Sequence, residues 1–384
     1  MGAKKTDKKI QTVAVLGLGK VGTLAAQLLA DAGFRVTGYD RHGHKSKYFK
    51  THTLDVTDSE ALNAVVGKAD AVLSCLPYNF NKDVATLAAA ENTHYFDLTE
   101  DVETTNHIRA LAKGADCVFA PQCGLAPGFI GIVGANLARG FDTLRSIKLR
   151  VGALPQNPTG IMGYNFNWSP EGVVNEYLND CEVIQNGVRK TVSPLDWLED
   201  IYINGQKLEA FTTSGGLGTM CETYEGKVEH LDYKSIRYPG HARVMNFFFH
   251  ELLMEEDRAL AGKILTHAKP PVNDDMVYIH AAVEGDQNGA LLREEFVRSY
   301  RPQIIDGKFW RAISWTTAAS VAAVIEMVSA GTLPQKGFIK QEEIPLKDFL
   351  KTRNGHLYIV GDKQTGMRRL SLEADEITKS DLEE

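Results

Sequence analysis

The sequence lacks the features that place a protein in a membrane or on a nucleic acid. No apolar run approaches the roughly 20 residues of a membrane span, and the Lys-rich start at residues 3–9 has no apolar segment of the signal-peptide kind. The net charge is -7, so the basic surface that nucleic-acid binding needs is not expected. We therefore expect a cytoplasmic protein that acts on a small molecule, with no nucleic-acid or membrane partner.

Cysteine is scarce and follows no pattern. The five cysteines are odd in number and no pair has Cys-x-x-Cys spacing, so neither a disulfide framework nor a metal site is expected. Cys75 and Cys123 are expected at strand ends, where a reactive thiol is the alternative to the usual small buried side chain. The chain has 384 residues, 43% hydrophobic and 24% charged, which indicates a globular protein long enough for two domains.

The most informative feature that is present is a glycine-rich turn between an expected strand, residues 12–16, and an expected helix. The glycines follow the Gly-x-Gly-x-x-Gly pattern, and apolar residues then recur at helical spacing up to Gly33. This arrangement indicates a dinucleotide site, because the free N–H groups at a helix N-terminus bind a diphosphate. The predicted cofactor contacts in the turn are Gly17, Leu18, Gly19, Lys20, Val21 and Gly22.

Asp40 follows the next expected strand, residues 34–39, about where the dinucleotide pattern places an acidic residue. A carboxylate there accepts hydrogen bonds from the ribose hydroxyls of NAD and repels the 2′-phosphate of NADP. Arg41 and His42 come next and could instead bind that phosphate, so NADP is the alternative. The sequence therefore favours NAD as the cofactor.

Strands and helices alternate through the first third of the chain. Expected strands cover residues 53–56, 71–76, 95–98 and 118–120, and expected helices cover residues 59–66, 83–90, 108–112 and 129–137. Such alternation is typical of a doubly wound parallel sheet. We predict an α/β protein with a Rossmann-type doubly wound parallel sheet and a second α+β domain built on an antiparallel sheet.

The pattern changes after about residue 143, where the second domain is expected to begin. Three Asn-Gly pairs, which start at Asn186, Asn204 and Asn288, lie between strand-like runs and predict hairpins. The last pair would join residues 276–283 to residues 290–300 in one long hairpin. The remaining expected element is a helix at residues 170–178, with Ser169 as its cap and Pro170 at its first position.

These patterns suggest a division into domains. We expect a tail at residues 1–10, a dinucleotide-binding domain at 11–143 and a substrate and oligomerisation domain at 144–308. An apolar helix within residues 309–335 is expected to pack back on the first domain, the alternative being a terminal helix of the sheet domain. Residues 336–384 form a C-terminal extension with an acidic tail. Uncovered strand edges favour pairing between subunits, so a homodimer or larger homo-oligomer is expected.

Ligands of a doubly wound sheet bind beyond the carboxyl ends of its strands, which selects further candidates. On the cofactor side, besides Asp40 and Arg41, these are Asp55, Cys75, Leu76, Pro77 and Leu98. Tyr78, Asp97 and Gln122 are expected at the nicotinamide end. Structural alternatives remain for three of them: Asp97 could cap a helix, Tyr78 could be a rim aromatic and Asp55 could close a turn.

Several short motifs then occur in a specific order and spacing. They are Leu76-Pro-Tyr78, Gly124-Leu-Ala-Pro-Gly128, Gly152-Ala-Leu-Pro155, Tyr164-Asn-Phe-Asn-Trp168-Ser-Pro170, Glu176-Tyr177, Val183-Ile-Gln-Asn-Gly187, Glu209-Ala-Phe211 and Arg237-Tyr-Pro-Gly-His241. On these motifs the chain resembles the saccharopine dehydrogenase superfamily over about residues 11–350, and within it the lysine 6-dehydrogenase branch. Ala153 departs from the Gly-Gly-Leu-Pro loop of that family, a change expected to narrow the substrate pocket.

The resemblance implies an NAD-dependent oxidation at the ε-carbon of L-lysine, a step of amino-acid metabolism that gives 2-aminoadipate 6-semialdehyde, which then cyclises. The ε-amine has an ordinary pKa of about 10.4 and must first lose a proton, so the site needs a base. Asp97 is the candidate to hold the amine and His241 the candidate to take or relay the proton. Tyr78 is the candidate to orient the substrate or the attacking water.

Recognition of an amino acid also needs a partner for its α-carboxylate, and arginine offers a bidentate set of donors. Arg237 is predicted for this role, and the alternative for it is a surface ion pair. The other predicted substrate contacts are Tyr78, Gln122, Tyr164, His241 and Thr316. Two other functions stay open: a saccharopine or carboxynorspermidine dehydrogenase that acts on a secondary amine or imine, and a dinucleotide-binding regulator without turnover.

Overall fold

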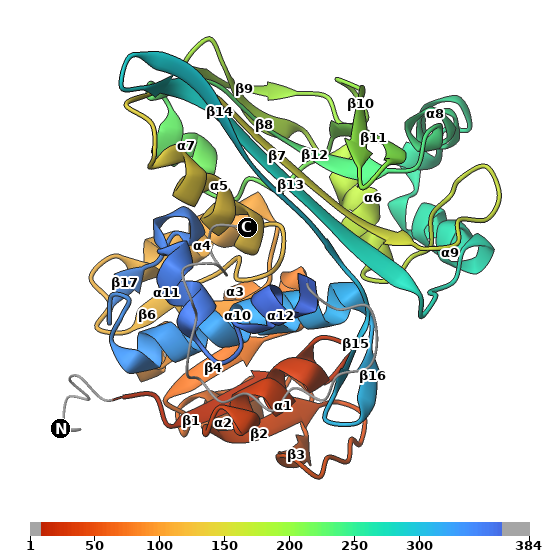
Figure 1. The fold of residues 1–384 in the computed structure, drawn as a ribbon. Helices are drawn as coiled ribbons and strands as arrows, with labels where there is room; N and C mark the ends of the chain where they lie inside the picture. Colours follow the sequence, from red (N-terminus) through yellow and green to blue (C-terminus); the bar gives the residue numbers. More distant parts are fainter. Residues whose placement is uncertain (1–8, 363–384) are drawn as a thin grey trace. The chain divides into compact units, whose positions relative to one another are not determined.

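The computed structural model describes residues 9–362, and within this range the chain divides into two compact units (Figure 1). Unit 1 consists of residues 9–129 and 314–360, and unit 2 consists of residues 130–313 with residues 361 and 362. The chain thus passes into unit 2 before residue 143 and returns to unit 1 near the start of the long apolar helix. The acidic tail predicted near the C-terminus lies outside the described residues.

Unit 1 contains a seven-stranded sheet in which every pairing is parallel. Its strands are β1 (Thr12–Leu16), β2 (Arg35–Asp40), β3 (Lys50–Thr53), β4 (Ala71–Ser74), β5 (His94–Asp97), β6 (Val118–Ala120) and β17 (Gly337–Phe338). The strand order is β17-β6-β5-β4-β1-β2-β3. From β1 the chain adds β2 and β3 on one side and then β4, β5 and β6 on the other, so the switch point lies between β1 and β4, which is where such sheets bind ligands. The predicted doubly wound parallel sheet is confirmed.

Three helices pack their apolar faces on one side of this sheet, through residues such as Leu62, Val84 and Ile108. The helices of the first part of unit 1 are α1 (Gly22–Asp31), α2 (Ser59–Val66), α3 (Asn81–Glu91), preceded by the turn η1 (Tyr78–Phe80), and α4 (Val102–Ala112). Side chains cap two of them: Asp58 accepts from the N–H of Ala61 and Asp101 from that of Thr104. The Asp101 cap explains why α4 begins six residues earlier than the apolar pattern predicted.

One strand of the parallel sheet lies earlier than predicted. The expected strand at residues 53–56 is β3 at Lys50–Thr53, which pairs with β2. Leu54 follows β3 in an irregular segment and packs in the core. The sequence pattern of residues 53–56 resembled a strand because it contains this buried apolar residue.

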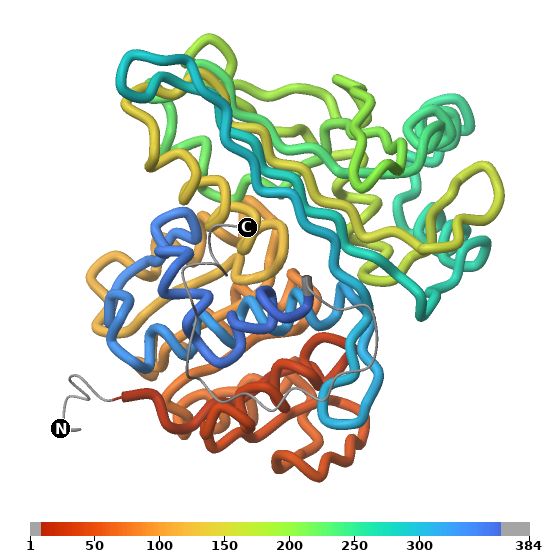
Figure 2. The backbone as a smooth tube through the Cα atoms, in the orientation of Figure 1, coloured from red at the N-terminus to blue at the C-terminus, as the bar shows by residue number. Residues whose placement is uncertain are grey.

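The C-terminal part of the chain completes unit 1 (Figure 2). It contains α10 (Ala312–Ala330), β17, η4 (Gln341–Glu343), α11 (Leu346–Lys351) and α12 (Leu357–Asp362). Tyr358 joins α12 to α10 and to Phe129, because its hydroxyl donates to the carbonyl of Thr316 and its ring centre lies 3.8 Å from that of Phe129. The extension predicted from residue 336 is therefore, as far as residue 360, a packed part of unit 1.

Helix α10 is long and apolar enough, by length and composition, to cross a membrane. The sequence pattern predicted no run of this kind, because Ser and Thr residues interrupt the apolar ones. In the folded chain 78% of its apolar window is buried inside the protein, as is usual for the core helix of a folded domain.

Unit 2 is built on an eight-stranded sheet. Its strands are β7 (Thr143–Pro155), β8 (Cys181–Gln185), β9 (Val188–Val192), β10 (Glu199–Ile203), β11 (Gln206–Thr212), β12 (Val228–Arg237), β13 (Asp275–Gln287) and β14 (Ala290–Tyr300). The main order is β10-β11-β12-β7-β13-β14, with β8 pairing both β12 and β9. β12 pairs with β7 in parallel, so the prediction of an antiparallel sheet is wrong for this pair. The long connection from β7 to β12 supplies the crossover that parallel pairing requires.

All three hairpins predicted at Asn-Gly pairs are present, as β8–β9, β10–β11 and β13–β14. Asn186, Asn204 and Asn288 have φ values of 54°, 50° and 53°, as type I′ turns require. A fourth hairpin, between β15 (Gln303–Ile305) and β16 (Lys308–Trp310), turns at Asp306-Gly307 and was not predicted. Asp-Gly is an equally suitable turn pair, but these strands are too short to show alternation.

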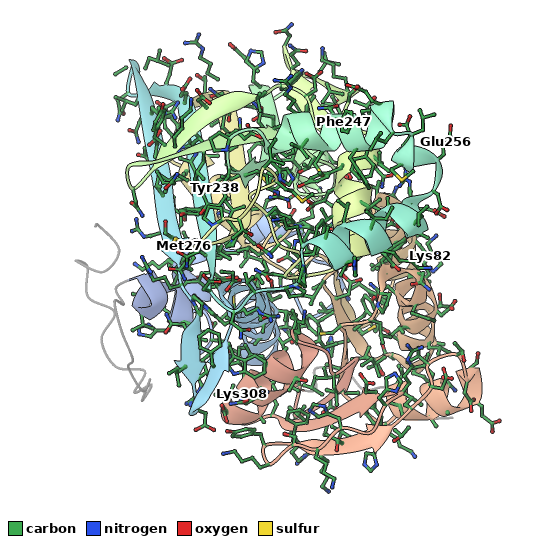
Figure 3. The ribbon with its side chains drawn as sticks, turned by 90° about the vertical axis from the view of Figure 1, so that its right-hand side faces the viewer. Lys82, Tyr238, Phe247, Glu256, Met276 and Lys308 are labelled. Carbon is green, nitrogen blue, oxygen red and sulfur yellow. The ribbon has the colours of Figure 1, made fainter. Side chains whose placement is uncertain are left out.

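The core of unit 2 lies between its sheet and a group of helices, and includes Tyr177, Phe211 and Phe249. Met276 and Tyr238 line the same core (Figure 3). The helical elements are α5 (Phe129–Ala138), α6 (Pro170–Leu178), α7 (Met220–Tyr224), α8 (His241–Asn246), the π-helix η2 (Phe247–Glu251), η3 (Met254–Glu256) and α9 (Arg258–Ala268). The predicted helix α6 is confirmed, with the Ser169 side chain accepting from the N–H of Gly172. Helix α9 was missed, although its cap Asp257 was a usable signal.

Candidate active site

The glycine turn lies at the switch point of the parallel sheet, beside the end of β4. A Cβ atom on Gly22 would come within 1.9 Å of the Gly17 carbonyl oxygen, whereas a Cβ on Gly19 would meet nothing within 4 Å. Helix α1 can therefore pack tightly against the turn, while the backbone at Gly19 stays open to a large anion. These are the conditions that a dinucleotide diphosphate needs, so the residues present fit such a cofactor.

Asp40 lies at the end of β2 and is held against the turn. Its Oδ2 accepts from the N–H of Leu18 at 2.8 Å, and its Oδ1 accepts from the N–H of His42 at 2.9 Å. Each carboxylate oxygen has a second lone pair with which to accept from a ribose hydroxyl. Arg41 and His42 are exposed beside it, and Arg41 Nε lies 3.1 Å from His42 Nε2.

The other predicted cofactor contacts are at the carboxyl ends of β3, β4 and β5. Leu76 and Leu98 are half-buried, and Pro77 is exposed after β4. Asp55 accepts hydrogen bonds from the backbone and hydroxyl of Thr57, which lower its pKa, so it closes a turn in this structure. Burial raises the pKa of the Cys75 thiol to about 12, which keeps it protonated at neutral pH and argues against a reactive thiol.

Asp97 ends β5 and is completely buried. Oδ1 accepts from the N–H groups of Thr99 and Gln122, at 3.0 and 2.9 Å, and Oδ2 accepts from the Tyr95 hydroxyl at 2.8 Å. Burial raises the pKa of Asp97 to about 6 against the opposing effect of these donors. Its predicted role in holding the amine stays a prediction. The observed contacts fix the backbone that follows β6, where Gln122 has a left-handed φ of 65°.

The raised pKa of Asp97 predicts a specific pH dependence of stability. The folded chain binds this proton more tightly than the unfolded chain between the ordinary pKa of 3.8 and about 6, so stability falls as pH rises through that window. In Asp97→Asn this ionisation is absent. The difference in unfolding free energy, variant minus wild type, should increase by on the order of 3 kcal/mol from about pH 4 to pH 7.

Urea unfolding at both pH values measures this difference. Asp83→Asn, which changes an exposed carboxylate in the first turn of α3, is the matched control. A difference for Asp97→Asn that stays constant with pH would show that Asp97 ionises equally in the folded and unfolded chains.

The remaining predicted contacts in unit 1 differ in exposure. Tyr78 is 40% exposed at the start of η1, whereas Gln122 and Thr316 are buried. The Gln122 side chain donates to the Thr105 hydroxyl at 3.1 Å. Of these three residues, Tyr78 is the one whose side chain is open to a ligand.

In unit 2 the structure brings together Arg237 and His241 with Tyr177, a residue to which the sequence assigned no role. His241 Nδ1 lies 2.8 Å from the Met162 carbonyl oxygen, which can only accept, so Nδ1 carries the proton. Burial, together with the charge of Arg237, lowers the pKa of His241 to about 3, and the ring is neutral. The Tyr177 hydroxyl therefore donates to His241 Nε2 at 3.0 Å and accepts from Arg237 Nε at 2.7 Å.

Arg237 is also held from its other sides. Its Nη1 donates to the Ile236 carbonyl at 2.9 Å, and its guanidinium carbon lies 4.6 Å from the centre of the Tyr164 ring. The Tyr164 hydroxyl accepts from Trp168 Nε1 at 3.2 Å. With 3% of its surface exposed, Arg237 is a buried, oriented cation, so the alternative of a surface ion pair is wrong.

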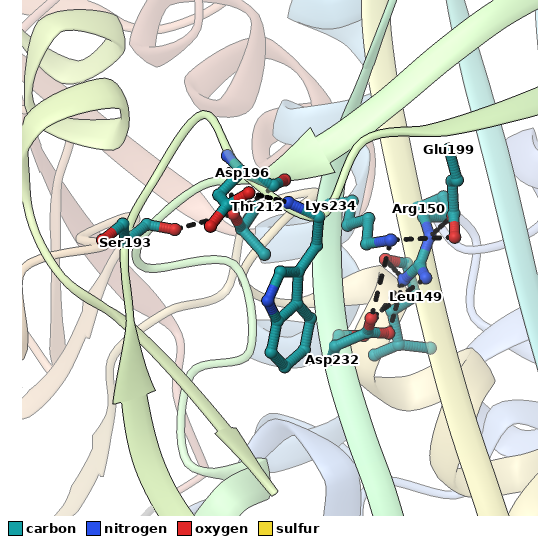
Figure 4. A network of polar contacts seen from close by, with 9 residues as sticks. Leu149, Arg150, Ser193, Asp196, Glu199, Thr212, Asp232 and Lys234 are labelled. Atoms are coloured by element: carbon teal, nitrogen blue, oxygen red, sulfur yellow. Dashed lines mark hydrogen bonds and ion pairs between the residues drawn. The ribbon is translucent and has the colours of Figure 1, made fainter. Parts of the chain in front are cut away.

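A second polar network in unit 2 involves Arg150 (Figure 4). Every guanidinium nitrogen of Arg150 donates to a protein acceptor, mainly the carboxylates of Asp232 and Glu199. Lys234 joins the network by donating to Glu199 at 2.8 Å. These charges neutralise one another, so this network is explained by the fold without a ligand.

Comparisons with known proteins agree with this architecture. The model of the saccharopine dehydrogenase NADP binding domain matches residues 13–116, and that of the saccharopine dehydrogenase C-terminal domain matches residues 124–356. The saccharopine dehydrogenase [NADP(+), L-glutamate-forming] of Pyricularia oryzae is 26% identical over 190 residues, which cover 46% of this chain and 42% of that protein. The mitochondrial alpha-aminoadipic semialdehyde synthase of Bos taurus is 24% identical over 67% of this chain and 29% of its own length.

This chain matches less than half the length of these curated relatives. A solved structure of apo histidine-tagged saccharopine dehydrogenase (L-Glu forming) from Saccharomyces cerevisiae has the same fold. It superimposes with a TM-score of 0.70 at 18% identity, over 90% of this chain and 98% of that chain. With the domain models matching both parts of the sequence, the chain belongs to the saccharopine dehydrogenase family.

Proposed function

We propose that the protein is an NAD-dependent dehydrogenase that oxidises the ε-carbon of L-lysine. The amine becomes an imine, and water converts the imine to 2-aminoadipate 6-semialdehyde with release of ammonia; the product cyclises to piperideine-6-carboxylate. The observation that carries the proposal is Arg237, a buried cation oriented by Tyr177 and Tyr164. Arg237 lies in unit 2, and unit 1 of the same chain has an intact dinucleotide turn.

In this proposal unit 2 holds the amino-acid end of the substrate. Of the two buried arginines among its described residues, Arg150 has every nitrogen engaged, whereas Arg237 Nη2 forms no hydrogen bond within residues 9–362. A single available guanidinium suits the single carboxylate of lysine. Saccharopine carries carboxylates on both halves and would need further cationic partners.

The three catalytic candidates have different surroundings, and we assign their roles accordingly. Tyr78 is exposed and would meet the substrate or the attacking water. Asp97 acts as a positioning residue through the backbone of Gln122, and His241 acts through Tyr177, because their polar atoms are already engaged. The nicotinamide of a bound cofactor supplies the hydride acceptor.

The choice of NAD rests on Asp40, and Asp40→Ser should reverse it. Removing the carboxylate removes repulsion of the 2′-phosphate, so kcat/KM with NADP relative to NAD should rise roughly 100-fold. Parallel assays of reduced nicotinamide absorbance measure the ratio. Glu60→Gln, which changes an exposed carboxylate in the first turn of α2, should leave it unchanged. An unchanged ratio in Asp40→Ser would contradict the assignment of Asp40 to the ribose.

A saccharopine-type dehydrogenase using NADP is the second candidate. It is favoured by the match to the saccharopine dehydrogenase NADP binding domain and by relatives named as NADP(+)-dependent saccharopine dehydrogenases. Exposed Arg41 beside the turn also suits a 2′-phosphate. Lysine, saccharopine and carboxynorspermidine, each assayed with both cofactors, separate the candidates. Oxidation of lysine by NAD supports the first proposal, and oxidation of saccharopine alone replaces it with the second. A lack of turnover with every amine would indicate a dinucleotide-binding regulator.

A further inference from the structure

Glu176 on helix α6 has a buried carboxylate oxygen without a hydrogen bond. Its Oε2 is enclosed, and no described residue donates to it. Only 7% of the surface of Glu176 is exposed. A buried carboxylate oxygen that lacks a donor is costly, so such a group in a folded protein calls for an explanation.

The nearest cation does not provide that donor. Arg237 Nη2 lies 3.7 Å from Glu176 Oε2, which is beyond hydrogen-bond distance. The other two nitrogens of Arg237 donate to Tyr177 and to the Ile236 carbonyl, which fixes the guanidinium in place. A buried carboxyl group on α6 and a cation at the end of β12 thus lie close together, and both retain unused hydrogen-bonding capacity.

An α-amino-acid head group complements this pair, because its carboxylate and ammonium are attached to one carbon atom. We propose that Glu176 binds the α-ammonium group of the amino-acid substrate whose α-carboxylate is held by Arg237. The proposal rests on the role given to Arg237 in the proposed function and adds the second half of head-group recognition. The ε-amine of lysine is four bonds further from the carboxylate, so the short Arg237–Glu176 separation favours the α-ammonium.

The electrostatics of the pair are consistent with this role. Burial raises the pKa of Glu176, and the charge of Arg237 opposes that effect. A bound ammonium would add three donors and a positive charge next to the carboxylate, which stabilises its ionised form. Tyr164 and Tyr177 flank the Arg237 guanidinium at 4.6 and 5.6 Å from their ring centres, and both tyrosines are buried.

Substrate analogues test the proposal through turnover. 6-Aminohexanoate lacks the α-amino group of lysine but keeps the carboxylate and the ε-amine. Glu176→Gln should lower kcat/KM for L-lysine roughly 10- to 200-fold, mainly by raising KM, with less than a threefold change for 6-aminohexanoate. Glu171→Gln, on an exposed position of the same helix, should leave both substrates unaffected. Equal losses for both substrates in Glu176→Gln would overturn the proposal.

Ligand-induced thermal stabilisation separates this inference from the proposed reaction. L-Norleucine has the head group without the ε-amine, and both it and L-lysine should stabilise the wild type but not Glu176→Gln. This result would support the head-group site even if lysine is not oxidised. Stabilisation of both proteins alike, or of neither, would overturn it. If Glu176→Gln does not fold, Glu176→Asp keeps the charge on a shorter side chain and should bind both ligands with intermediate affinity.

Discussion

Replacement of Arg237 by alanine should reduce kcat/KM for L-lysine by roughly 30- to several-thousand-fold, most of it as a higher KM. The reason is that truncation removes the donor set for the α-carboxylate and leaves the buried carboxyl group of Glu176 without its neighbouring cation. Arg237→Lys should recover little, because an ammonium cannot donate to Tyr177 and to a carboxylate in the fixed planar geometry of a guanidinium. Steady-state rates of nicotinamide reduction measure both effects.

The matched control for this experiment is Arg243→Ala. Arg243 lies on α8, two residues after His241, and is exposed to solvent. It should change neither kinetic constant. Thermal melting of each variant without substrate distinguishes lost binding from lost folding. If KM for lysine is unchanged in a folded Arg237→Ala protein, the α-carboxylate is held elsewhere.

Gly22→Ala should strongly weaken dinucleotide binding. The new Cβ would lie 1.9 Å from the Gly17 carbonyl oxygen, so either the turn or the start of α1 must move. Such overpacking costs about 1–3 kcal/mol of stability, and the displaced turn no longer directs its N–H groups at a diphosphate. Fluorescence titration with NADH should show at least a 100-fold weaker affinity, equivalent to about 3 kcal/mol.

Gly43→Ala is the matched control, since a Cβ there meets no atom within 4 Å and the residue is exposed. It should bind NADH as the wild type does. Wild-type affinity in Gly22→Ala would mean that the cofactor binds away from this turn. Loss of affinity in both variants would indicate a general effect on unit 1 rather than a local one.

Those parts of the fold that depend on local signals could be predicted from the sequence. β1 and α2 have the predicted bounds, and the three Asn-Gly hairpins form where expected, because turn residues and apolar periodicity act over a few residues. The parallel pairing of β12 with β7 was not predictable in this way. It joins segments on either side of the long connection after Pro155, and no short stretch of sequence encodes it.

The two-residue strand β17 is a second pairing that short-range sequence patterns could not predict. It adds to the edge of the parallel sheet beside β6, more than 200 positions away in sequence, and is too short to show alternation. Its place depends on contacts with residues far away in the sequence, such as the Arg109 guanidinium that lies 5.3 Å from the centre of the Phe338 ring.

For the candidate site, the sequence selected residue types but not their environments. Asp40, Arg237 and His241 were identified as candidates, yet the tautomer of His241 depends on the Met162 carbonyl, which lies 79 positions away. Glu176 and Tyr177 were noted only as part of a motif. The unpaired oxygen of Glu176 is a property of its three-dimensional surroundings, because burial is a sum over contacts with distant segments.

Unit 1 is assembled from two separated stretches of chain, and this arrangement sets the order in which the molecule can be completed during synthesis. Residues 314–360, with α10 and β17, are translated after all of residues 130–313. Unit 2 is nearly continuous and is available to fold as soon as it has emerged, since domains generally fold as units. The unit that carries the glycine turn is therefore completed only after the main stretch of unit 2, residues 130–313, has been synthesised.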